Sequence, residues 1–239
     1  MAVISTSRPP KRGAPFSAAC GGFTLLEILV AIFIFAIVVT TIFGSFNSVF
    51  SKGEELQTDV VVYEMARRCL SRMAADLAQI YVAQRPAYVP PATSDEEDPY
   101  QVIGEEVLRG SSGFARLRFA SRAHLPMGAS PGGGVARIVY YPDEVADGSL
   151  VLRRSDQADP APEFEESPAD PIICENLRAM TCTFFDEDGN PHEGWDSDAA
   201  EYGFGTPVGV GIKLEIGDDQ RAAVFETRVA LPVFREQSK

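Results

Sequence analysis

The sequence has few of the residues from which catalytic and metal sites are most often built. Its 239 residues include two isolated histidines, His124 and His192, and four cysteines without metal-ligand spacing. A zinc site needs three or four clustered ligands, and nucleophilic catalysis needs a nucleophile held beside a base. We therefore expect a protein that is not an enzyme and that has no cofactor.

Basic patches are also lacking. The chain has 34 acidic residues against 21 Lys and Arg, a formal net charge of -13, and no Lys- or Arg-rich stretch follows residue 51. A nucleic-acid partner calls for a basic face that neutralises phosphates. The sequence therefore predicts no nucleic-acid partner.

One long apolar run lies near the N-terminus. No charged residue occurs from Ile28 to Ser51, and residues 23–43 reach the roughly 20 apolar residues that cross a hydrocarbon core. Three basic residues and no acidic one precede the run, and acidic residues follow it from Glu54. This asymmetry predicts a single-pass membrane protein with a cytoplasmic N-terminus and most of the chain outside the cytoplasm.

Two other kinds of signal could contain such a run. A secretory signal would place a small-x-small cleavage site after the apolar residues, but the small residues "SAACGG" come before them. A lipoprotein signal would place its cysteine after the run, whereas Cys20 precedes it. The order of the segments therefore fits neither of these signals.

A single carboxylate, Glu27, stands at the head of the apolar run. An ionised side chain costs about 2.5–3.5 kcal/mol at the centre of a membrane helix on insertion scales, and less near the interface. The helix dipole favours a carboxylate in the first turn, which is one explanation. A nearby cation that pairs with the carboxylate is the other.

The stretch "GGFTLLEILVAIFIFAIVV" (residues 21–39) resembles the leader junction of type IV prepilins and type II secretion pseudopilins. The resemblance implies that a prepilin peptidase removes residues 1–22 by cutting between Gly22 and Phe23, and then methylates the amino group of Phe23. Glu27 would become the fifth residue of the mature chain. The new amino group of Phe23, or that of a neighbouring subunit, would then supply the missing cation, and Glu27 would act in assembly.

Four later stretches together are similar to minor pseudopilins of the J class. The resemblance implies a structural subunit of the pseudopilus tip, anchored in the inner membrane with a periplasmic C-terminal domain. It also implies as partners the I- and K-class tip subunits, the major pseudopilin, prepilin peptidase, the inner-membrane assembly platform and secreted substrate. The stretches are "RRCLSRMAADLAQIYVAQRP" (67–86), "RIVYYPDEVADGSLVLRR" (137–154), "FFDEDGNPHEGWD" (184–196) and "TPVGVGIKLEI" (206–216).

Two alternative functions remain open at the level of sequence. A minor pilin of a type IV pilus would share every N-terminal feature. A membrane-anchored periplasmic enzyme would need a catalytic cluster, which the sequence does not display.

A helical pattern continues beyond the apolar run. Apolar residues recur at steps of three and four from Leu56 to Ile80, while Arg72 and Asp76 fall off this stripe and are expected in solvent. Pro86 is expected to end the helix. The pattern predicts a membrane or filament-core helix over 23–50 and an amphipathic continuation over 51–86. A coiled-coil dimer is an alternative for the stripe, but docking onto a sheet is favoured because strands follow.

Residues 87–239 are expected to form a β-rich head domain. Stretches such as "FARLRFA" (114–120) and "VARIVYY" (135–141) alternate apolar and other residues between Gly, Pro and Asp clusters. The acid- and Pro-rich loops 88–106 and 155–170 are expected to be exposed. The chain as a whole predicts an α+β, pilin-like fold in which a long N-terminal helix packs on antiparallel sheet.

Two further pairs of residues are candidate sites. Cys174 and Cys182 could form a disulfide if their strands are adjacent and the compartment is oxidising, or they are simply two small buried residues. Asp186 and Asp188, in "DEDGN", resemble the start of a calcium loop, although a Gly-Asn hairpin turn explains the stretch better. Trp195 and Tyr202 lie in an acidic loop, where a buried anchor is expected and a protein-contact patch is the alternative.

Overall fold

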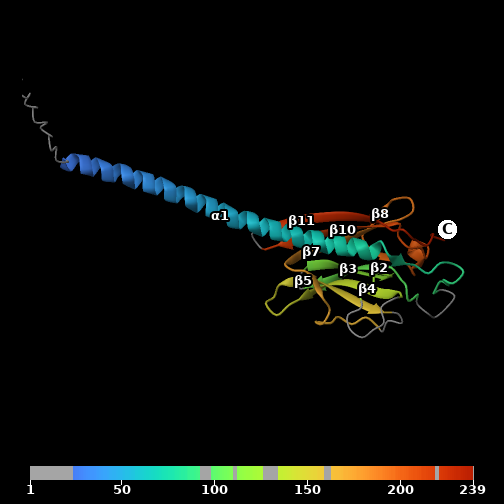
Figure 1. Ribbon diagram of the computed structural model, residues 1–239. Coiled ribbons are helices and arrows are strands. Elements are labelled where there is room, and N and C mark those ends of the chain that lie inside the picture. Colours follow the sequence, from blue (N-terminus) through green and yellow to red (C-terminus); the bar gives the residue numbers. More distant parts are fainter. Residues whose placement is uncertain are drawn as a thin grey trace, which may run out of the picture. The chain divides into compact units, whose positions relative to one another are not determined.

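The α+β prediction is confirmed by the computed structural model, which describes residues 24–91, 98–109, 112–125, 134–158, 163–218 and 221–238. One long helix is followed by antiparallel strands (Figure 1). The chain divides into two compact units, residues 1–55 and 56–239. The helix α1 (Leu25–Leu77) begins in the first unit and ends in the second.

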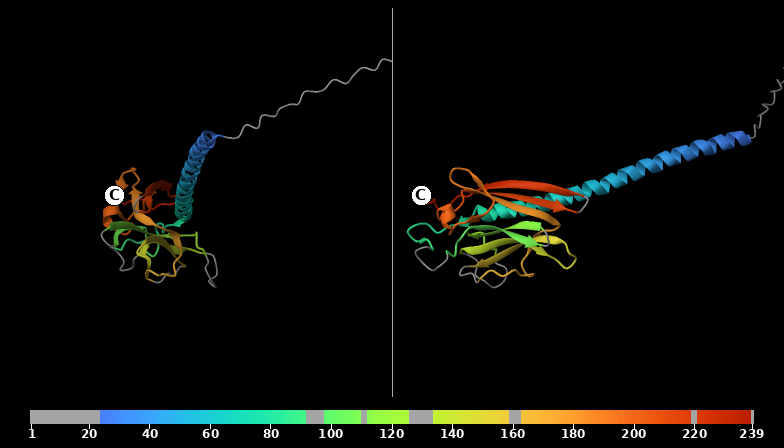
Figure 2. Two further views of the ribbon diagram at one scale, coloured as in Figure 1. Left: turned by 90° about the vertical axis from the view of Figure 1, so that its left-hand side faces the viewer. Right: turned by 180° about the vertical axis from the view of Figure 1, so that it is seen from behind.

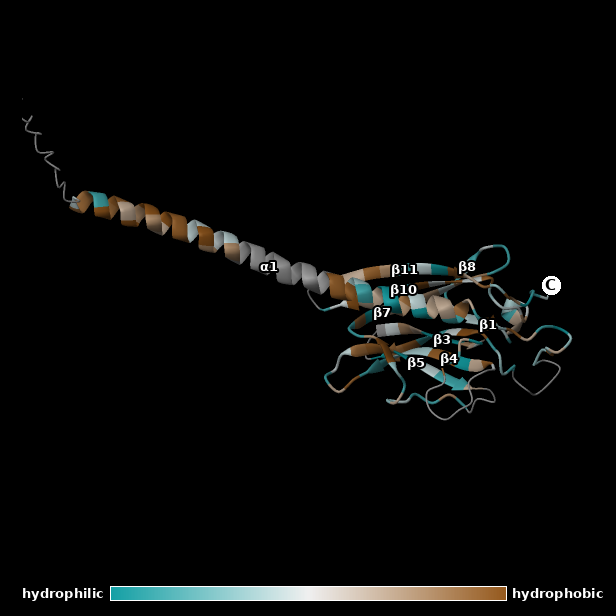
Figure 3. Cartoon of the chain, viewed as in Figure 1, coloured by the Kyte–Doolittle hydropathy of each residue, from teal (hydrophilic) through white to brown (hydrophobic). Residues whose placement is uncertain are grey.

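The first unit contains the apolar part of α1. Every described residue from Leu25 to Phe46 is exposed except Val39, which is half-buried. Figure 3 shows this part of the helix mostly brown, the colour of hydrophobic residues, with a teal turn near its start. A helix that is apolar on all sides needs lipid or other helices around it, because water would solvate these side chains poorly.

The helix ends at Leu77, so its predicted continuation to Pro86 is wrong at the C-terminal end. Instead, Ile80 and Tyr81 form the short strand β1, which pairs with β3. The hydroxyl of Ser121 donates to the carbonyl oxygens of Asp76 (2.8 Å) and Gln79 (3.2 Å). These bonds satisfy carbonyls at the helix end, which a further helical turn would otherwise have satisfied.

The strands form two antiparallel sheets (Figures 1 and 2). The first has the order β6-β5-β4-β3-β2-β9, with β1 paired to β3, and the second has the order β11-β10-β7-β8. A short 3-10 helix η1 (Ala200–Tyr202) lies between β9 and β10 in the chain. The first sheet contains β1 (Ile80–Tyr81), β2 (Ile103–Arg109), β3 (Ser112–Ser121), β4 (Ala136–Glu144), β5 (Leu150–Ala158), β6 (Ile172–Cys174) and β9 (Trp195–Asp196). The second contains β7 (Leu177–Phe185), β8 (Pro191–His192), β10 (Gly209–Gly217) and β11 (Ala222–Ala230).

A single core cluster joins the second half of α1 to both sheets. Met73 and Leu77 of the helix are fully buried, as are Phe119 of β3 and Ile212 of β10. Burying one such side chain stabilises the fold by about 1.5–3 kcal/mol. The helix therefore docks on the sheets of its own chain, as expected, although Tyr63 of the predicted stripe is exposed.

Several residues expected at the surface are buried instead. Asp76 has no exposed surface, and in the loop predicted as exposed Tyr88 is 5% and Asp98 9% exposed. Ser155, placed by the sequence in a second exposed loop, belongs to β5 and is 1% exposed. Asp76 and Asp98 can be buried because each forms an ion pair with its own buried arginine.

The approach of β2 to β7 requires a residue without a side chain. A Cβ atom on Gly104 would lie 1.9 Å from Cζ of Phe184, whose ring is fully buried. We expect Gly104→Ala to lower the free energy of unfolding by about 1–3 kcal/mol, because an overpacked core must shift side chains or backbone. Urea denaturation followed by the fluorescence of Trp195, the one tryptophan in the sequence, measures the change.

Gly113→Ala is the matched control. Its Cβ would meet the carboxylate of Glu106, an exposed side chain that can rotate away. We expect a change within about 0.5 kcal/mol. Equal losses for the two variants would show that the ring of Phe184 does not limit the packing at Gly104.

Candidate functional site

The start of α1 is held by a reciprocal pair of hydrogen bonds. The backbone N–H of Glu27 donates to Oγ1 of Thr24 (3.3 Å), and the N–H of Thr24 donates to Oε2 of Glu27 (3.4 Å). This is a capping box, in which an N-cap Thr and a Glu three residues later satisfy each other's backbone donors. The sequence analysis missed this role of Thr24, although the pattern "TLLE" is its usual signal.

The polar side chains farther along the apolar segment are satisfied within the helix. The hydroxyls of Thr40, Thr41 and Ser45 donate to backbone carbonyl oxygens three or four residues earlier, at 2.7–2.9 Å. Residues 25–46 form a helical segment long and apolar enough to cross a membrane. Because its hydroxyls need no water, the segment can lie in lipid or among other helices without unsatisfied polar groups.

The predicted processing residues lie at the edge of what the structure describes. Gly22 and Phe23 are outside the described residues, whereas Glu27 is exposed in the first turn of α1. The cleavage site therefore stays a prediction from the sequence.

Asp76 is the centre of a buried polar network in the second unit. One of its carboxylate oxygens accepts from Arg72, and the other accepts from Nε of Arg154 (2.7 Å) and from the hydroxyl of Tyr140 (2.5 Å). Burial raises the pKa of Tyr140 far above its usual value, and the negative charge of Asp76 raises it further. The phenol therefore remains a hydrogen-bond donor to the carboxylate.

Arg154 extends the Asp76 network along β5. Its guanidinium also donates to Asp156 (2.6 Å), whose other carboxylate oxygen lies 2.6 Å from Nδ1 of His124. Burial alone would lower the pKa of Arg154, but its hydrogen bonds to the two aspartates outweigh burial and raise it. Burial would likewise raise the pKa of Asp156, but the hydrogen bond with His124 helps to hold it below the usual value. The network thus fastens the end of α1 to β4 and β5.

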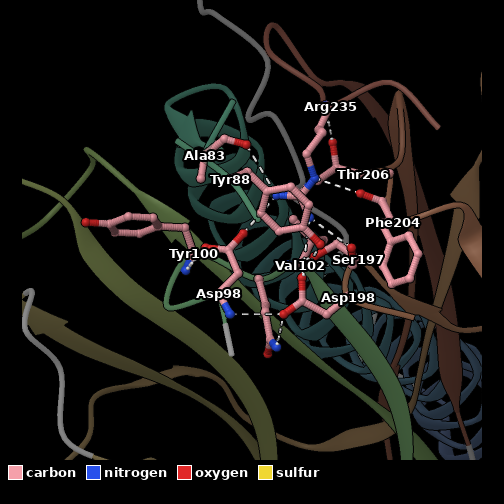
Figure 4. A network of polar contacts seen from close by, with 12 residues as sticks. Ala83, Tyr88, Asp98, Tyr100, Val102, Ser197, Asp198, Phe204, Thr206 and Arg235 are labelled. Carbon is pink, nitrogen blue, oxygen red and sulfur yellow. Dashed lines mark hydrogen bonds and ion pairs between the residues drawn. The ribbon is translucent and has the colours of Figure 1, made fainter. Parts of the chain in front are cut away.

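Arg235, near the C-terminus, organises a second buried network (Figure 4). Its side chain is 2% exposed and donates to the carboxylate of Asp98 (2.8 Å). It also donates to the carbonyl oxygens of Phe204 (2.7 Å) and Ser197 (2.8 Å). Arg235 therefore joins the C-terminal segment to the loops before β2 and after β9.

Aromatic rings close the Arg235 network. The guanidinium carbon of Arg235 lies 3.2 Å from the centre of the Tyr88 ring, and the Tyr88 hydroxyl donates to Asp198 (2.9 Å). Burial raises the pKa of Tyr88 above its usual range. Nearby, Trp195 is 2% exposed and stacks on Tyr202 with 4.4 Å between ring centroids. The prediction of Trp195 as a buried anchor is confirmed.

The cysteines are not arranged as the sequence suggested. Cys174 ends β6 in the first sheet and Cys182 lies in β7 of the second, and both thiols are free. The condition set for their disulfide, adjacent strands, is not met, because β6 and β7 belong to different sheets. Cys174 instead interacts with Cys69 of α1, whose pKa it raises.

Asp186 begins a tight turn between β7 and β8. Its carboxylate accepts from the backbone N–H (2.8 Å) and side-chain amide (3.0 Å) of Asn190, and lies 3.1 Å from Nε2 of His192. The hydrogen bond from Asn190 lowers the pKa of Asp186 to about 2. The turn has Gly189 at φ +84°, which glycine adopts readily, as the hairpin interpretation requires. Asp188 is exposed.

The ionisable side chains of the two buried networks make structural contacts. Within them no three His, Cys, Asp or Glu side chains are grouped so that they could hold a metal ion. The buried ionisable groups at Asp76, Arg154, Asp98 and Arg235 are bonded to one another or to backbone. Such an arrangement stabilises a domain.

Two protein-family models match two successive parts of the chain. Residues 17–43 match the prokaryotic N-terminal methylation motif, and residues 44–226 match type II secretion system (T2SS) protein J. No curated protein matches the chain. The second match covers more than half of the sequence and includes α1 beyond residue 44, the first sheet, the second sheet as far as the middle of β11, and the Asp76 network.

Proposed function

The chain belongs to the protein J family of the type II secretion system and is a minor pseudopilin, and we propose that it acts at the pseudopilus tip, where it primes assembly. The single observation that carries this proposal is the methylation motif followed directly by a protein J domain. A minor pilin of a type IV pilus is not favoured, because the domain that follows the motif is of the J family. The family is one of structural subunits.

The N-terminal segment supports two successive locations for the subunit, first the inner membrane and then the fibre. Before assembly, the exposed apolar residues 25–46 would hold it in the inner membrane as a single-pass protein, with the N-terminus in the cytoplasm and the second unit in the periplasm. On entering the fibre, helix–helix packing would replace lipid around the same surface. The partners would be other pseudopilins, including the I- and K-class subunits and the major pseudopilin, with prepilin peptidase, the assembly platform and secreted substrate.

Glu27 gains a second partner in this scheme. Within the chain its carboxylate accepts from the backbone of Thr24 at 3.4 Å, a long bond that leaves acceptor capacity on an exposed side chain. Cleavage after Gly22 would create the amino group of Phe23 one turn away. That amine, or the amine of a neighbouring subunit, would neutralise the carboxylate in an apolar environment and set the register of the helices.

We expect the mature protein to begin at an N-methylated Phe23. N-terminal mass spectrometry of the full chain, from cells with and without prepilin peptidase, measures this directly. Cells without the peptidase should yield a chain that retains residues 1–22. A mature chain that starts elsewhere would exclude the processing step.

Two variants distinguish assembly from helix capping. Thr24→Val removes the capping hydroxyl and keeps the carboxylate, and loss of an N-cap costs about 1 kcal/mol. Glu27→Leu removes the carboxylate. We expect Glu27→Leu to be processed but to lose co-purification with other pseudopilins, while Thr24→Val retains it. Equal behaviour of the two variants would show that Glu27 serves only the helix start.

A further inference from the structure

Two buried thiols from different elements lie next to each other in the second unit. Cys69 is on α1 and Cys174 ends β6, and each is 1% exposed. Both belong to the core cluster between the helix and the sheets. Cys174 raises the pKa of Cys69, so the two thiols lie within interaction distance of each other.

The backbone around the pair holds β6 against the helix independently of the thiols. The N–H of Glu175 donates to Sδ of Met65 at 3.3 Å, and Met65 lies one helical turn before Cys69. Arg68 of the helix and Ile173 of β6 line a groove together with Met65 and Cys174. The adjacency of Cys69 and Cys174 therefore follows from the docking of two elements.

We propose that Cys69 and Cys174 form a disulfide that joins α1 to β6. The inference rests on the proposed function for the location of the second unit, because disulfides form and persist in compartments such as the bacterial periplasm. The bond requires thiols that face each other and close to a sulfur–sulfur distance of about 2.05 Å. It would fasten the helix that continues into the membrane to an edge strand that pairs only with β5 in its sheet.

The oxidant would be a protein disulfide of the thiol–disulfide exchange class. The thiolate of one cysteine attacks the oxidant's disulfide, forms a mixed disulfide and expels one oxidant thiolate. The thiolate of the second cysteine then attacks the first cysteine's sulfur and expels the other oxidant thiolate. The two cysteines lose two protons and two electrons in all, and the oxidant's disulfide becomes two thiols.

The order of folding and oxidation follows from the surroundings of the pair. The hydrogen bond with Cys174 and then burial raise the pKa of Cys69 far above its usual value, so the folded chain holds little thiolate. We therefore expect oxidation while the second unit folds, before the core closes. Cys182 lies on β7 of the other sheet, where burial raises its pKa to about 12, and is expected to stay a thiol.

Peptide mapping tests the proposal on the unmodified full chain. The three cysteines that follow the apolar segment fall in separate tryptic peptides, residues 69–72, 155–178 and 179–213. Protein extracted from membranes is quenched in acid, alkylated and digested without reductant. We expect a 69–72 to 155–178 conjugate that reduction removes, with 179–213 alkylated. Alkylated 69–72, or its linkage to 179–213, would overturn the proposal.

A second experiment separates the disulfide from the location of the second unit. Reduced full-length protein in detergent is unfolded and refolded in a glutathione redox buffer, then mapped in the same way. Wild type and the matched control Cys182→Ser should form the link, and reduction should lower their urea midpoints. Cys174→Ser should show neither effect. Failure of wild type to form the link here overturns the disulfide, whereas protease protection of the second unit in spheroplasts would overturn its periplasmic location instead.

Discussion

Arg235→Met is expected to lower the free energy of unfolding by about 3–5 kcal/mol, because it leaves a buried carboxylate without its cation. Asp98 is 9% exposed and would lose its ion pair with the guanidinium at 2.8 Å. The carbonyl oxygens of Phe204 and Ser197 would lose their side-chain donor at the same time. The methionine side chain is similar in length to the arginine side chain. The loss of unfolding free energy therefore measures the missing hydrogen bonds and charge more than the creation of a cavity.

Arg228→Met makes the same chemical change at an exposed site. Arg228 lies over the ring of Phe185, with 3.4 Å from its guanidinium carbon to the ring centre. Exposed cation–π contacts are worth about 0.5–1 kcal/mol, so we expect a loss of that size or less. Urea denaturation followed by Trp195 fluorescence compares the two variants. A loss for Arg235→Met no larger than for Arg228→Met would show that the Arg235 network does not stabilise the fold.

Asp76→Ala is expected to cost about 3–5 kcal/mol as well, because Arg154, which is 2% exposed, would keep Asp156 but lose the other of its two carboxylate partners, and Arg72 would lose its carboxylate partner too. The hydroxyl of Tyr140 would also lose its acceptor. The Asp76 network fastens the end of α1 to β4 and β5, so the variant should loosen the docking of the helix. Hydrogen exchange of the α1 amides over residues 60–77, together with urea denaturation, measures both effects.

A surface pair and a double variant complete this test. Glu64→Ala removes a 3.8 Å ion pair with Arg67 whose side chains are 43% and 67% exposed, and we expect at most about 0.5 kcal/mol. Asp76→Leu combined with Arg154→Met removes both partners of the buried pair. Because the buried charge of Arg154 is removed together with that of Asp76, and Asp156 keeps its contact with His124 at 2.6 Å, this double variant should lose less stability than Asp76→Ala. Equal losses would indicate that packing, and not charge, holds the helix end.

Both networks connect segments of the second unit that are distant in the chain. The Asp76 network connects the last turn of α1 to the first sheet, and the Arg235 network connects the C-terminal segment to the loops around β2 and β9. The proposed disulfide would add a covalent connection at β6.

Patterns that extend over many residues were predictable from the sequence. The apolar run, the "GGFTLLE" stretch and the alternation of the strands each depend on local order along the chain, and the family matches agree with the function they implied. The helical periodicity also identified Met73 and Leu77 as core residues. A stripe of apolar residues marks a buried face wherever that face eventually docks.

Single polar residues were not predictable in the same way. Asp76 falls off the apolar stripe, and its sequence neighbours give no sign that Arg154, 78 positions later, pairs with it. The capping box of Thr24 and Glu27 is a local pattern and could have been found, whereas the burial of Asp98 by Arg235 could not. The end of α1 at Leu77 depends on Ser121 in the same way, since the helix itself could have continued.

Hydrophobicity and charge are properties of the residues in order, so the membrane-length helix and the carboxylate at its head can be predicted from the amino-acid sequence. The residue at which the helix stops, the charges that are buried and the thiols that meet depend on how the chain folds. Those outcomes depend on contacts between distant segments, such as Cys69 with Cys174, whose partners are known only once the sheets have formed.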